Sequence, residues 1–213
     1  MMDAVYTVGH STHPIEKFIG LLKSQTIAAL CDVRSRPYSR MNSQFDREAL
    51  KGALAENGIK YVFLGKELGA RSEDKNCYLD GQVQFDLLAA TSLFNRGIER
   101  VVEGAQNYRI ALMCAEKEPL ECHRTILVAR KLHESGISIK HILADGRIER
   151  HEEAMDRLLL KLRIGQDMFR SREAVVKEAY ALQANEIAYR EKEDPENMDL
   201  EMFTPRALPG RGR

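Results

Sequence analysis

The sequence predicts an α/β protein of three layers, with a mostly parallel sheet of about five strands and helices on both faces. Five short apolar runs, rich in β-branched residues, alternate along the chain with segments whose apolar residues have helical spacing. The runs are nearly continuous in apolar residues, as is typical of strands buried on both faces. Strands that alternate with helices are joined by right-handed crossovers, which make the strands parallel.

The predicted strands are residues 4–8, 27–33, 60–64, 108–114 and 138–143. Helices are predicted between and after them at residues 14–24, 46–57, 85–104, 122–135 and 149–162. The first helix places Phe18 and Leu22 on one face, while Gly58 and Gly136 each follow a predicted helix as a C-terminal stop. We expect these elements to form one α/β domain over residues 1–162.

Residues 163–213 are predicted to form a C-terminal helical arm. A helix with a weak apolar stripe is expected at residues 171–189, and it either packs on the domain or pairs with a second copy in a homo-oligomer. From Glu191 onward the chain is dense in charged residues, Pro and Gly, so a disordered tail is expected.

Composition limits the partners of the protein. Lys+Arg and Asp+Glu both number 32 in 213 residues, so the formal net charge is +0. This balance argues against binding nucleic acid or membrane through overall charge, although nucleic acid still fits a local basic site. No apolar run approaches the roughly 20 residues that cross a bilayer. The four cysteines are too few for a disulfide scaffold, so we expect a cytoplasmic protein with reduced thiols and no membrane partner.

The candidate site lies where the predicted strands end. Polar segments follow the first, second and fourth strands, and the carboxyl ends of parallel strands share the sheet edge where open α/β sheets bind ligands. After the first strand, Gly9 permits an unusual backbone angle in a turn that precedes a helix, which favours anions. We take Gly9, Ser11 and Thr12 as anion-binding candidates. A simple helix cap is the alternative, but it does not explain His10.

The segment after the second strand is the most basic on the chain. Arg34, Arg36 and Arg40 offer guanidinium groups that capture phosphate or carboxylate through paired hydrogen bonds. Asp32 either orients one of these arginines or serves as a base. The alternative is a solvated loop with an internal ion pair.

The segment after the fourth strand contains Cys114, Glu116, Cys122, His123 and Arg124. The predicted helix places the last three in its first turn, where free N–H groups favour anions and lower the pKa of a thiol. Three interpretations remain open. The cysteines provide a nucleophile with His123 as base and Arg124 as anion ligand, or Cys114, Cys122 and His123 bind a metal such as zinc, or both cysteines are buried and structural.

The structural interpretation of the cysteines is preferred, and no cofactor is predicted. The segment has no Cys-x-x-Cys knuckle, and the adjacent residues Cys122 and His123 are expected to point in different directions, which weakens the zinc alternative. A connection of about 20 residues after the third strand is long for a compact domain, so it is either a lid that brings Arg71 and Tyr78 to the substrate or a variable insertion.

Five blocks in the order of the chain resemble DUF488, a bacterial and archaeal family. They are Gly-His-Ser-Thr, Asp-Val-Arg-Ser-Arg-Pro with Ser-Arg, Leu-Gly-Lys-Glu-Leu-Gly, Leu-Met-Cys-Ala-Glu with Cys-His-Arg, and His-Ile-Leu-Ala-Asp-Gly, within residues 5–160. The resemblance implies a fold and a motif set but no reaction. The family pattern falls on Gly9, His10, Ser11, Asp32, Arg34, Pro37, Arg40, Gly69, Cys114, Glu116, Cys122, His123 and Arg124.

We therefore expect an enzyme, a hydrolase or transferase using His/Glu or Cys/His chemistry, that acts on a small phosphate-bearing or otherwise anionic substrate such as a nucleotide or a nucleic-acid end. His10 and His123 are the expected acid/base pair. The catalytic candidates are His10, Asp32, Cys114, Glu116 and His123, and the anion-binding candidates are Gly9, Ser11, Thr12, Arg34, Arg36, Arg40 and Arg124. The alternative is a non-catalytic nucleotide-binding, anion-binding or regulatory module.

Overall fold

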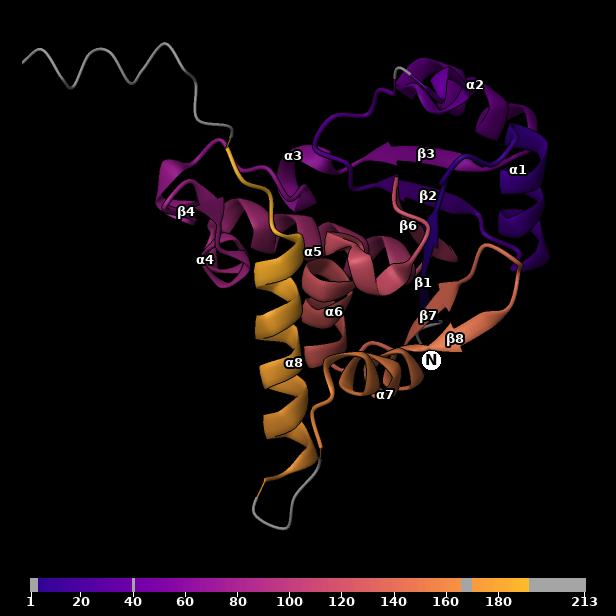
Figure 1. Ribbon diagram of the computed structural model, residues 1–213. Coiled ribbons are helices and arrows are strands. Elements are labelled where there is room, and N and C mark those ends of the chain that lie inside the picture. Colours follow the sequence, from indigo (N-terminus) through magenta and orange to yellow (C-terminus); the bar gives the residue numbers. More distant parts are fainter. Residues whose placement is uncertain (1–3, 40, 166–169, 192–213) are drawn as a thin grey trace, which may run out of the picture.

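A six-stranded sheet forms the centre of the computed structural model, which describes residues 4–39, 41–165 and 170–191 (Figure 1). The strand order is β3-β2-β6-β1-β7-β8, and all pairs are parallel except β7 with β8. The strands are β1 (Val5–Gly9), β2 (Ala29–Asp32), β3 (Lys60–Phe63), β6 (Ile110–Cys114), β7 (Ile139–Ile142) and β8 (Ile148–Arg150). The predicted α/β class with a mostly parallel sheet is confirmed.

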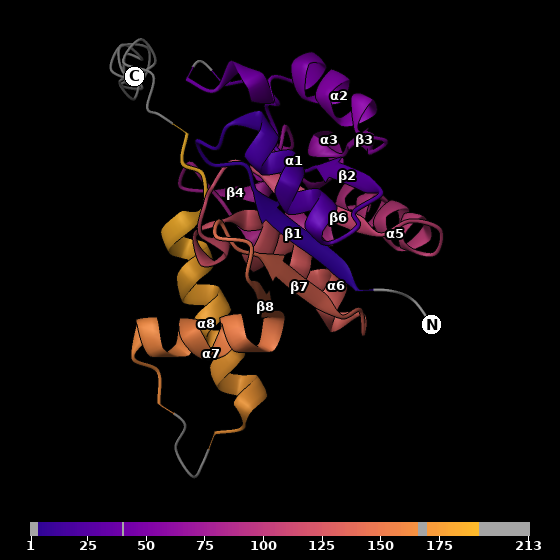
Figure 2. The same ribbon diagram turned by 90° about the vertical axis from the view of Figure 1, so that its right-hand side faces the viewer.

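Two hydrophobic cores lie on opposite faces of the sheet, because successive strand residues point to opposite sides. On one face, Val8 and Met113 pack with α1 (Ile15–Ser24) and α2 (Arg47–Glu56). On the other face, strand residues such as Leu112 pack with the C-terminal helix described below and with three further helices. The three are α5 (Ser92–Ala105), α6 (Arg130–Glu134) and α7 (His151–Leu162). Figures 1 and 2 show the resulting three layers.

The sheet has one strand more than predicted. Residues 149 and 150 were expected to open a helix, but together with Ile148 they pair with β7 as the antiparallel strand β8, and α7 begins only at His151. The turn between β7 and β8 contains Gly146 with a φ of 90°, a backbone conformation that favours glycine. The polar residues Glu149 and Arg150 conceal this edge strand in the sequence.

Two predicted helices are interrupted. The segment 85–104 divides into α4 (Phe85–Ala90) and α5 at Thr91, whose side chain accepts a hydrogen bond from the Phe94 N–H and caps α5. The segment 122–135 begins with a π-helix, η4 (Arg124–Ala129), before α6. All six residues of η4 are buried, and π-helical turns occur frequently at functional sites.

The C-terminal helix α8 (Arg172–Ile187) packs on the domain, the first of the two arrangements expected for it. It contacts α7, η4 and the short 3₁₀ helix η3 (Pro119–Glu121), and it buries Val175 and Tyr180. The chain after α8 pairs with the connection that follows β3, since the Val83 N–H donates to the Tyr189 carbonyl. The expected tail at 192–213 lies outside the described residues. The remaining elements are η1 (Ser43–Phe45), α3 (Gly65–Leu68), η2 (Lys75–Cys77), β4 (Tyr78–Leu79) and β5 (Gln82–Val83).

All four cysteines are free thiols, and all are buried. No helix in the described ranges is long and apolar enough to cross a membrane.

Candidate active site

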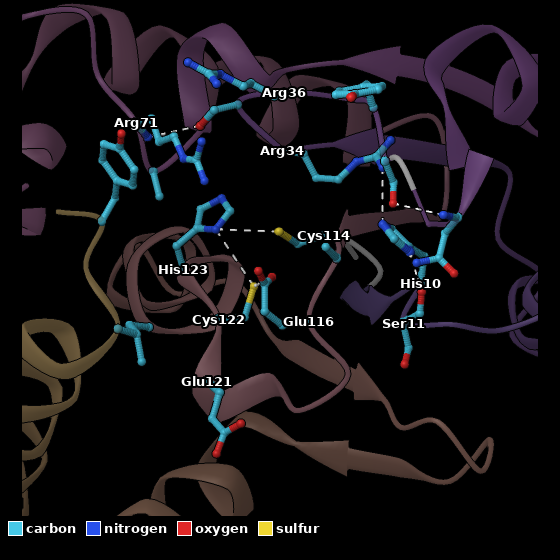
Figure 3. A pocket seen from close by; sticks show the side chains of 18 of the residues that line it. His10, Ser11, Arg34, Arg36, Arg71, Cys114, Glu116, Glu121, Cys122 and His123 are labelled. Carbon is cyan, nitrogen blue, oxygen red and sulfur yellow. Dashed lines mark hydrogen bonds between the residues drawn. The ribbon is translucent and has the colours of Figure 1, made fainter. Parts of the chain in front are cut away.

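A cavity of about 690 Å³ opens at the carboxyl edge of the sheet, between the loops that follow β1, β2 and β6 (Figure 3). The loop after α3 and the end of α8 complete its wall. The lining residues are His10, Ser11, Thr12, Arg34, Ser35, Arg36, Tyr38, Ser39, Asn42, Ala70, Arg71, Cys114, Ala115, Glu116, Glu121, Cys122, His123, Ile187 and Tyr189. The sheet therefore brings residues from distant parts of the chain to one cavity, as its topology predicts.

Four of these side chains form a cluster, which we call the Cys/Glu/His cluster: Cys114, Glu116, Cys122 and His123. Their donor atoms all lie within 4.8 Å of one another. His123 Nδ1 is 3.7 Å from Cys114 Sγ and 3.9 Å from Cys122 Sγ. Cys122 Sγ and Glu116 Oε2 are hydrogen-bonded at 2.9 Å. Glu116 is the exposed member, and the other three residues are buried.

The orientation of the His123 ring is fixed by a backbone carbonyl. His123 Nε2 lies 3.0 Å from the Val33 oxygen, which can only accept a hydrogen bond, so Nε2 carries a proton. In the neutral ring Nδ1 then presents its lone pair to the two sulfur atoms. Burial lowers the pKa of His123, but the hydrogen bond and charge of Cys122 outweigh this effect and raise its pKa above the ordinary value.

The two cluster thiols have opposite pKa shifts. Burial raises the pKa of both, and for Cys114 the neighbouring Cys122 raises it further. For Cys122 the hydrogen bond with Cys114 and the charges of Arg124 and His123 prevail, so its pKa lies well below the ordinary value. Cys122 also accepts a hydrogen bond from the Arg124 N–H at the start of η4, with a distance of 3.4 Å. Burial, and then the charge of Cys122, raises the pKa of Glu116.

Asp32 is fully buried and holds Arg34. Its carboxylate accepts hydrogen bonds from Arg34 Nε at 2.9 Å and Nη2 at 2.7 Å, and from the Tyr61 hydroxyl at 2.8 Å. Asp32 is not among the residues that line the cavity. Of the two roles predicted for it, this placement supports orientation of an arginine and corrects the expectation of a base.

Arg34 in turn fixes His10. Arg34 Nη1 is 3.2 Å from His10 Nε2, while His10 Nδ1 is 2.8 Å from the Ser11 carbonyl oxygen. The carbonyl requires a proton on Nδ1, so Nε2 accepts from Arg34 and both ring nitrogens are occupied. Burial, the largest cause, and the Arg34 charge lower the pKa of His10 to about 4, although the Ser11 hydrogen bond opposes them. His10 is therefore a neutral wall of the cavity, and this geometry does not support the expected acid/base pair with His123.

A family comparison agrees with the motifs of this site. A protein-family model, described as domain of unknown function DUF488, matches residues 14–131. The chain belongs to the DUF488 family. The matched residues include the segments after β2, β3 and β6, whereas the His10 turn lies before them. Neither the search of curated proteins nor the search of solved structures found a match.

Within the DUF488 domain, Arg124 does not reach the cavity. Its side chain is fully buried, and its guanidinium donates to the carbonyl oxygens of Glu116 at 2.7 Å and Lys117 at 3.4 Å. Arg124 therefore holds the loop that carries Glu116, which corrects the expectation that it contacts an anion directly.

Gly9 allows two loops to approach each other closely, and it does not line the cavity. The turn after β1 runs beside the loop after β6, since the N–H groups of His10 and Ser11 donate to the carbonyls of Cys114 and Ala115, both at 2.9 Å. A Cβ atom on Gly9 would lie 2.0 Å from the Glu116 carbonyl oxygen. The glycine is thus required for close approach, and the amides of His10 and Ser11 already donate to carbonyls of the neighbouring loop.

The remaining candidate residues differ in whether they line the cavity. Arg36 and Arg71 are exposed and line the cavity, as do Ser11 and Thr12, while Arg40 lies outside the described residues. Arg71 stacks over the Tyr189 ring at 4.4 Å. The predicted partner of Arg71, Tyr78, donates to the Ser72 carbonyl and is absent from the lining. No sequence pattern indicated Tyr189, because it lies at the end of a predicted helix that had no visible link to the sheet edge.

Proposed function

We propose that this DUF488 protein is an enzyme, a hydrolase or transferase, that acts on a phosphate-bearing or otherwise anionic substrate in the cavity at the sheet edge. The observation that carries this proposal is the combination, in one cavity, of exposed guanidinium groups and the Cys/Glu/His cluster. A volume of about 690 Å³ suits a ligand of nucleotide size.

Arg36 and Arg71 are the proposed anion ligands. They come from different loops, and neither forms a salt bridge with another residue of the described ranges. Stacking on Tyr189 holds the guanidinium plane of Arg71 in one orientation, which reduces the entropy lost when a phosphate binds. Arg34 is less available, because Asp32, His10 and the Phe45 carbonyl already occupy its donors.

A nucleotide or the phosphorylated end of a nucleic acid is the proposed substrate class. Tyr38 lines the cavity with 57% of its surface exposed, and an exposed aromatic ring supports a nucleobase by stacking. The neutral chain requires such recognition to be local, because no overall field attracts a polyanion.

Glu116 is the proposed proton-transferring residue. It is exposed at the cavity, its loop is fixed by Arg124, and its carboxylate reaches the cluster. A carboxylate placed in this way accepts a proton from an attacking nucleophile or donates one to a leaving group.

Turnover of defined compounds tests this function. The full chain is incubated with mononucleotides, dinucleotides and oligonucleotides phosphorylated at either end, and products are followed by released phosphate and by mass spectrometry. Glu116→Gln is expected to lower kcat by about 10²-fold or more, the scale of general acid–base catalysis. Arg36→Ala is expected to raise KM at least about 10-fold through loss of a charged hydrogen bond. Arg96→Ala removes the same charge from an exposed position on α5 outside the cavity, and should behave as the unmodified protein.

A different outcome would favour a non-catalytic nucleotide-binding, anion-binding or regulatory module. In that case a phosphorylated compound binds, Arg36→Ala abolishes the binding, and no bound compound is converted. Conversion that is unaffected by both Glu116→Gln and Arg36→Ala would place the activity elsewhere and contradict the proposal.

A further inference from the structure

The donor atoms of the Cys/Glu/His cluster have the spacing of a tetrahedral metal site. With Zn–S of about 2.3 Å and Zn–N of about 2.0 Å, a sulfur and a nitrogen bound to one tetrahedral zinc ion lie about 3.5 Å apart. The two observed sulfur–nitrogen distances are 3.7 and 3.9 Å. Since these donor atoms also lie within 4.8 Å of one another, Cys114 Sγ, Cys122 Sγ and His123 Nδ1 can surround one ion after small movements.

The outer contacts of His123 are those of a metal-binding histidine. Histidine ligands usually donate the proton of the second ring nitrogen to a carbonyl or carboxylate, which directs the other nitrogen to the metal. His123 Nε2 makes this bond to the Val33 carbonyl at 3.0 Å. The bond comes from Val33, which directly follows β2 and is itself held by a hydrogen bond from its N–H to the Met113 carbonyl.

Cys122 and His123 are adjacent in the sequence and were expected to point in different directions, which weakened the zinc alternative. Their backbone conformations remove this objection. Cys122 is extended, with φ −137° and ψ 138°, whereas His123 is helical, with φ −58° and ψ −27°. The change of conformation between these neighbours turns their side chains to the same point, although an uninterrupted helix would separate them. Cys114 reaches that point from the end of β6.

Burial distinguishes the three ligands from Glu116. Cys114, Cys122 and His123 are 3%, 1% and 9% exposed, while Glu116 is exposed on the cavity side. Its 2.9 Å contact with Cys122 Sγ is shorter than the roughly 3.6 Å expected between two ligands of one zinc ion. Glu116 therefore lies beside the fourth position rather than filling it.

We propose that Cys114, Cys122 and His123 bind one zinc ion whose fourth position faces the cavity next to Glu116. Two thiolates and an imidazole in a tetrahedral arrangement favour zinc over magnesium or calcium, which take oxygen ligands. Three protein ligands with one open position are typical of a catalytic zinc site, which activates water. The use of this ion in a reaction rests on the proposed function, whereas its binding rests on the cluster alone.

Metal titration of the full chain tests the site. The protein is purified with a phosphine reductant, stripped with a chelator, and titrated with Co²⁺ and then Zn²⁺. We expect one equivalent of cobalt, with a sulfur-to-cobalt charge-transfer band and the strong visible bands of tetrahedral cobalt, and displacement by one equivalent of zinc.

Matched variants locate the ion. Cys122→Ser and His123→Gln are expected to bind zinc at least about 100-fold more weakly, a larger loss than most outer contacts cause. Cys31→Ser changes a buried thiol on β2 outside the cluster and should bind zinc as the unmodified protein does. Glu116→Gln is expected to keep its zinc. If a cluster variant does not fold, the sulfur band of the unmodified protein still decides whether thiolates bind the ion.

Three results would each overturn the zinc site. The protein fails to bind one equivalent of metal, or it binds cobalt without the sulfur-to-cobalt band. The third is an unchanged zinc affinity in folded Cys122→Ser and His123→Gln. Pyrophosphate binding to the metal-free protein, measured by calorimetry with Arg71→Ala for comparison, separates this failure from failure of the proposed function. If only the zinc site is wrong, pyrophosphate still binds through Arg71. If only the anion-binding part of the proposed function is wrong, zinc binds and pyrophosphate does not. If only the catalytic part is wrong, both bind and none of the phosphorylated compounds is converted.

Discussion

Gly9 is a residue at which the candidate site depends on the space left beside the backbone. Gly9→Ala would place a Cβ atom 2.0 Å from the Glu116 carbonyl oxygen, and a backbone atom cannot move aside as a side chain can. We expect a loss of about 1–3 kcal/mol in the free energy of unfolding, the usual cost of overpacking. Urea denaturation measures this loss.

Gly20→Ala is the matched control for Gly9→Ala. Gly20 lies in α1, and a Cβ atom there meets nothing within 4 Å. Replacement by alanine in a helix should therefore stabilise the protein by about 0.5–1 kcal/mol. Equal stability of the two variants would show that the Glu116 loop is not held against β1.

For single residues, the sequence identified the residue types of the site better than the direction in which each side chain points. Glu116 and His123 were expected at the site because they follow one strand, and they line the cavity. Asp32 and Arg124 follow strands too, but their side chains turn into the protein, to Arg34 and to two carbonyls respectively. Only the path of the neighbouring loops determines that direction, and a residue pattern does not contain it.

At the element scale, a chain of buried hydrogen bonds joins β1, β7, α7 and α8. Thr7 Oγ1 is 2.8 Å from His141 Nδ1, His141 Nε2 is 3.0 Å from His151 Nδ1, and His151 Nε2 is 2.7 Å from the Tyr180 hydroxyl. Burial lowers the pKa of His151 to about 3, with a further contribution from the charge of His133, whose ring centroid is 4.8 Å away. Burial, and then His151, lowers the pKa of His141.

These pKa shifts predict acid sensitivity. The unfolded chain binds a proton at each histidine near pH 6.5, whereas folded His151 stays neutral down to about pH 3. The stability contributed by the neutral ring is therefore complete above about pH 6.5 and falls with pH by up to about 1.4 kcal/mol per unit.

Urea denaturation between about pH 7 and pH 4.5 measures this loss. His151→Gln should be less stable at neutral pH and less dependent on pH than the unmodified protein. His133→Gln, at a half-buried position on α6, should keep most of the pH dependence. A pH dependence that is the same in His151→Gln would show that the neutral His151 ring is not the source of the acid sensitivity.

Elements with strong patterns were predictable, and those that depend on a partner were not. The five apolar strands and α1 stand within a few residues of their predicted positions. The three residues of β8 become a strand only because β7 lies beside them. The π-helix η4 has the apolar pattern of an ordinary helix, and its wider turns follow from the packing around it. Thr91 is of a residue type that often caps helices, and it caps α5. The helical pattern continues on both sides of it, so one uninterrupted helix was predicted.

At the scale of the whole molecule, a chain with formal net charge +0 presents exposed arginines at one edge of its sheet. Binding of a 5′-phosphorylated single-stranded oligonucleotide should therefore depend weakly on salt. Two phosphate contacts, from Arg36 and Arg71, predict a slope of about −1.4 in log K against log salt, and Arg36→Ala should reduce its size by about 0.7. Fluorescence anisotropy measures both slopes, and a slope steeper than about −4 would indicate many contacts outside this cavity.

The fold class and the edge that carries the site followed from the alternation of strands and helices. The complete wall did not, because α8 and the Tyr189 that follows it approach the cavity through packing of α8 on η3, η4 and α7. The apolar stripe of α8 is weak, so the sequence did not determine which surface this helix packs against. In the structure, α8 buries Val175 and Tyr180 against the domain.

The position of a bound phosphate analogue shows whether the cavity at the sheet edge binds phosphate. Tungstate has the charge and shape of a phosphate dianion, and its anomalous scattering locates it in crystals of the full chain. We expect the strongest peak in the cavity between the guanidinium groups of Arg36 and Arg71 and the Cys/Glu/His cluster. Tungstate bound instead at the neighbouring cavity lined by Lys17 and Lys117, with the first cavity empty, would contradict it.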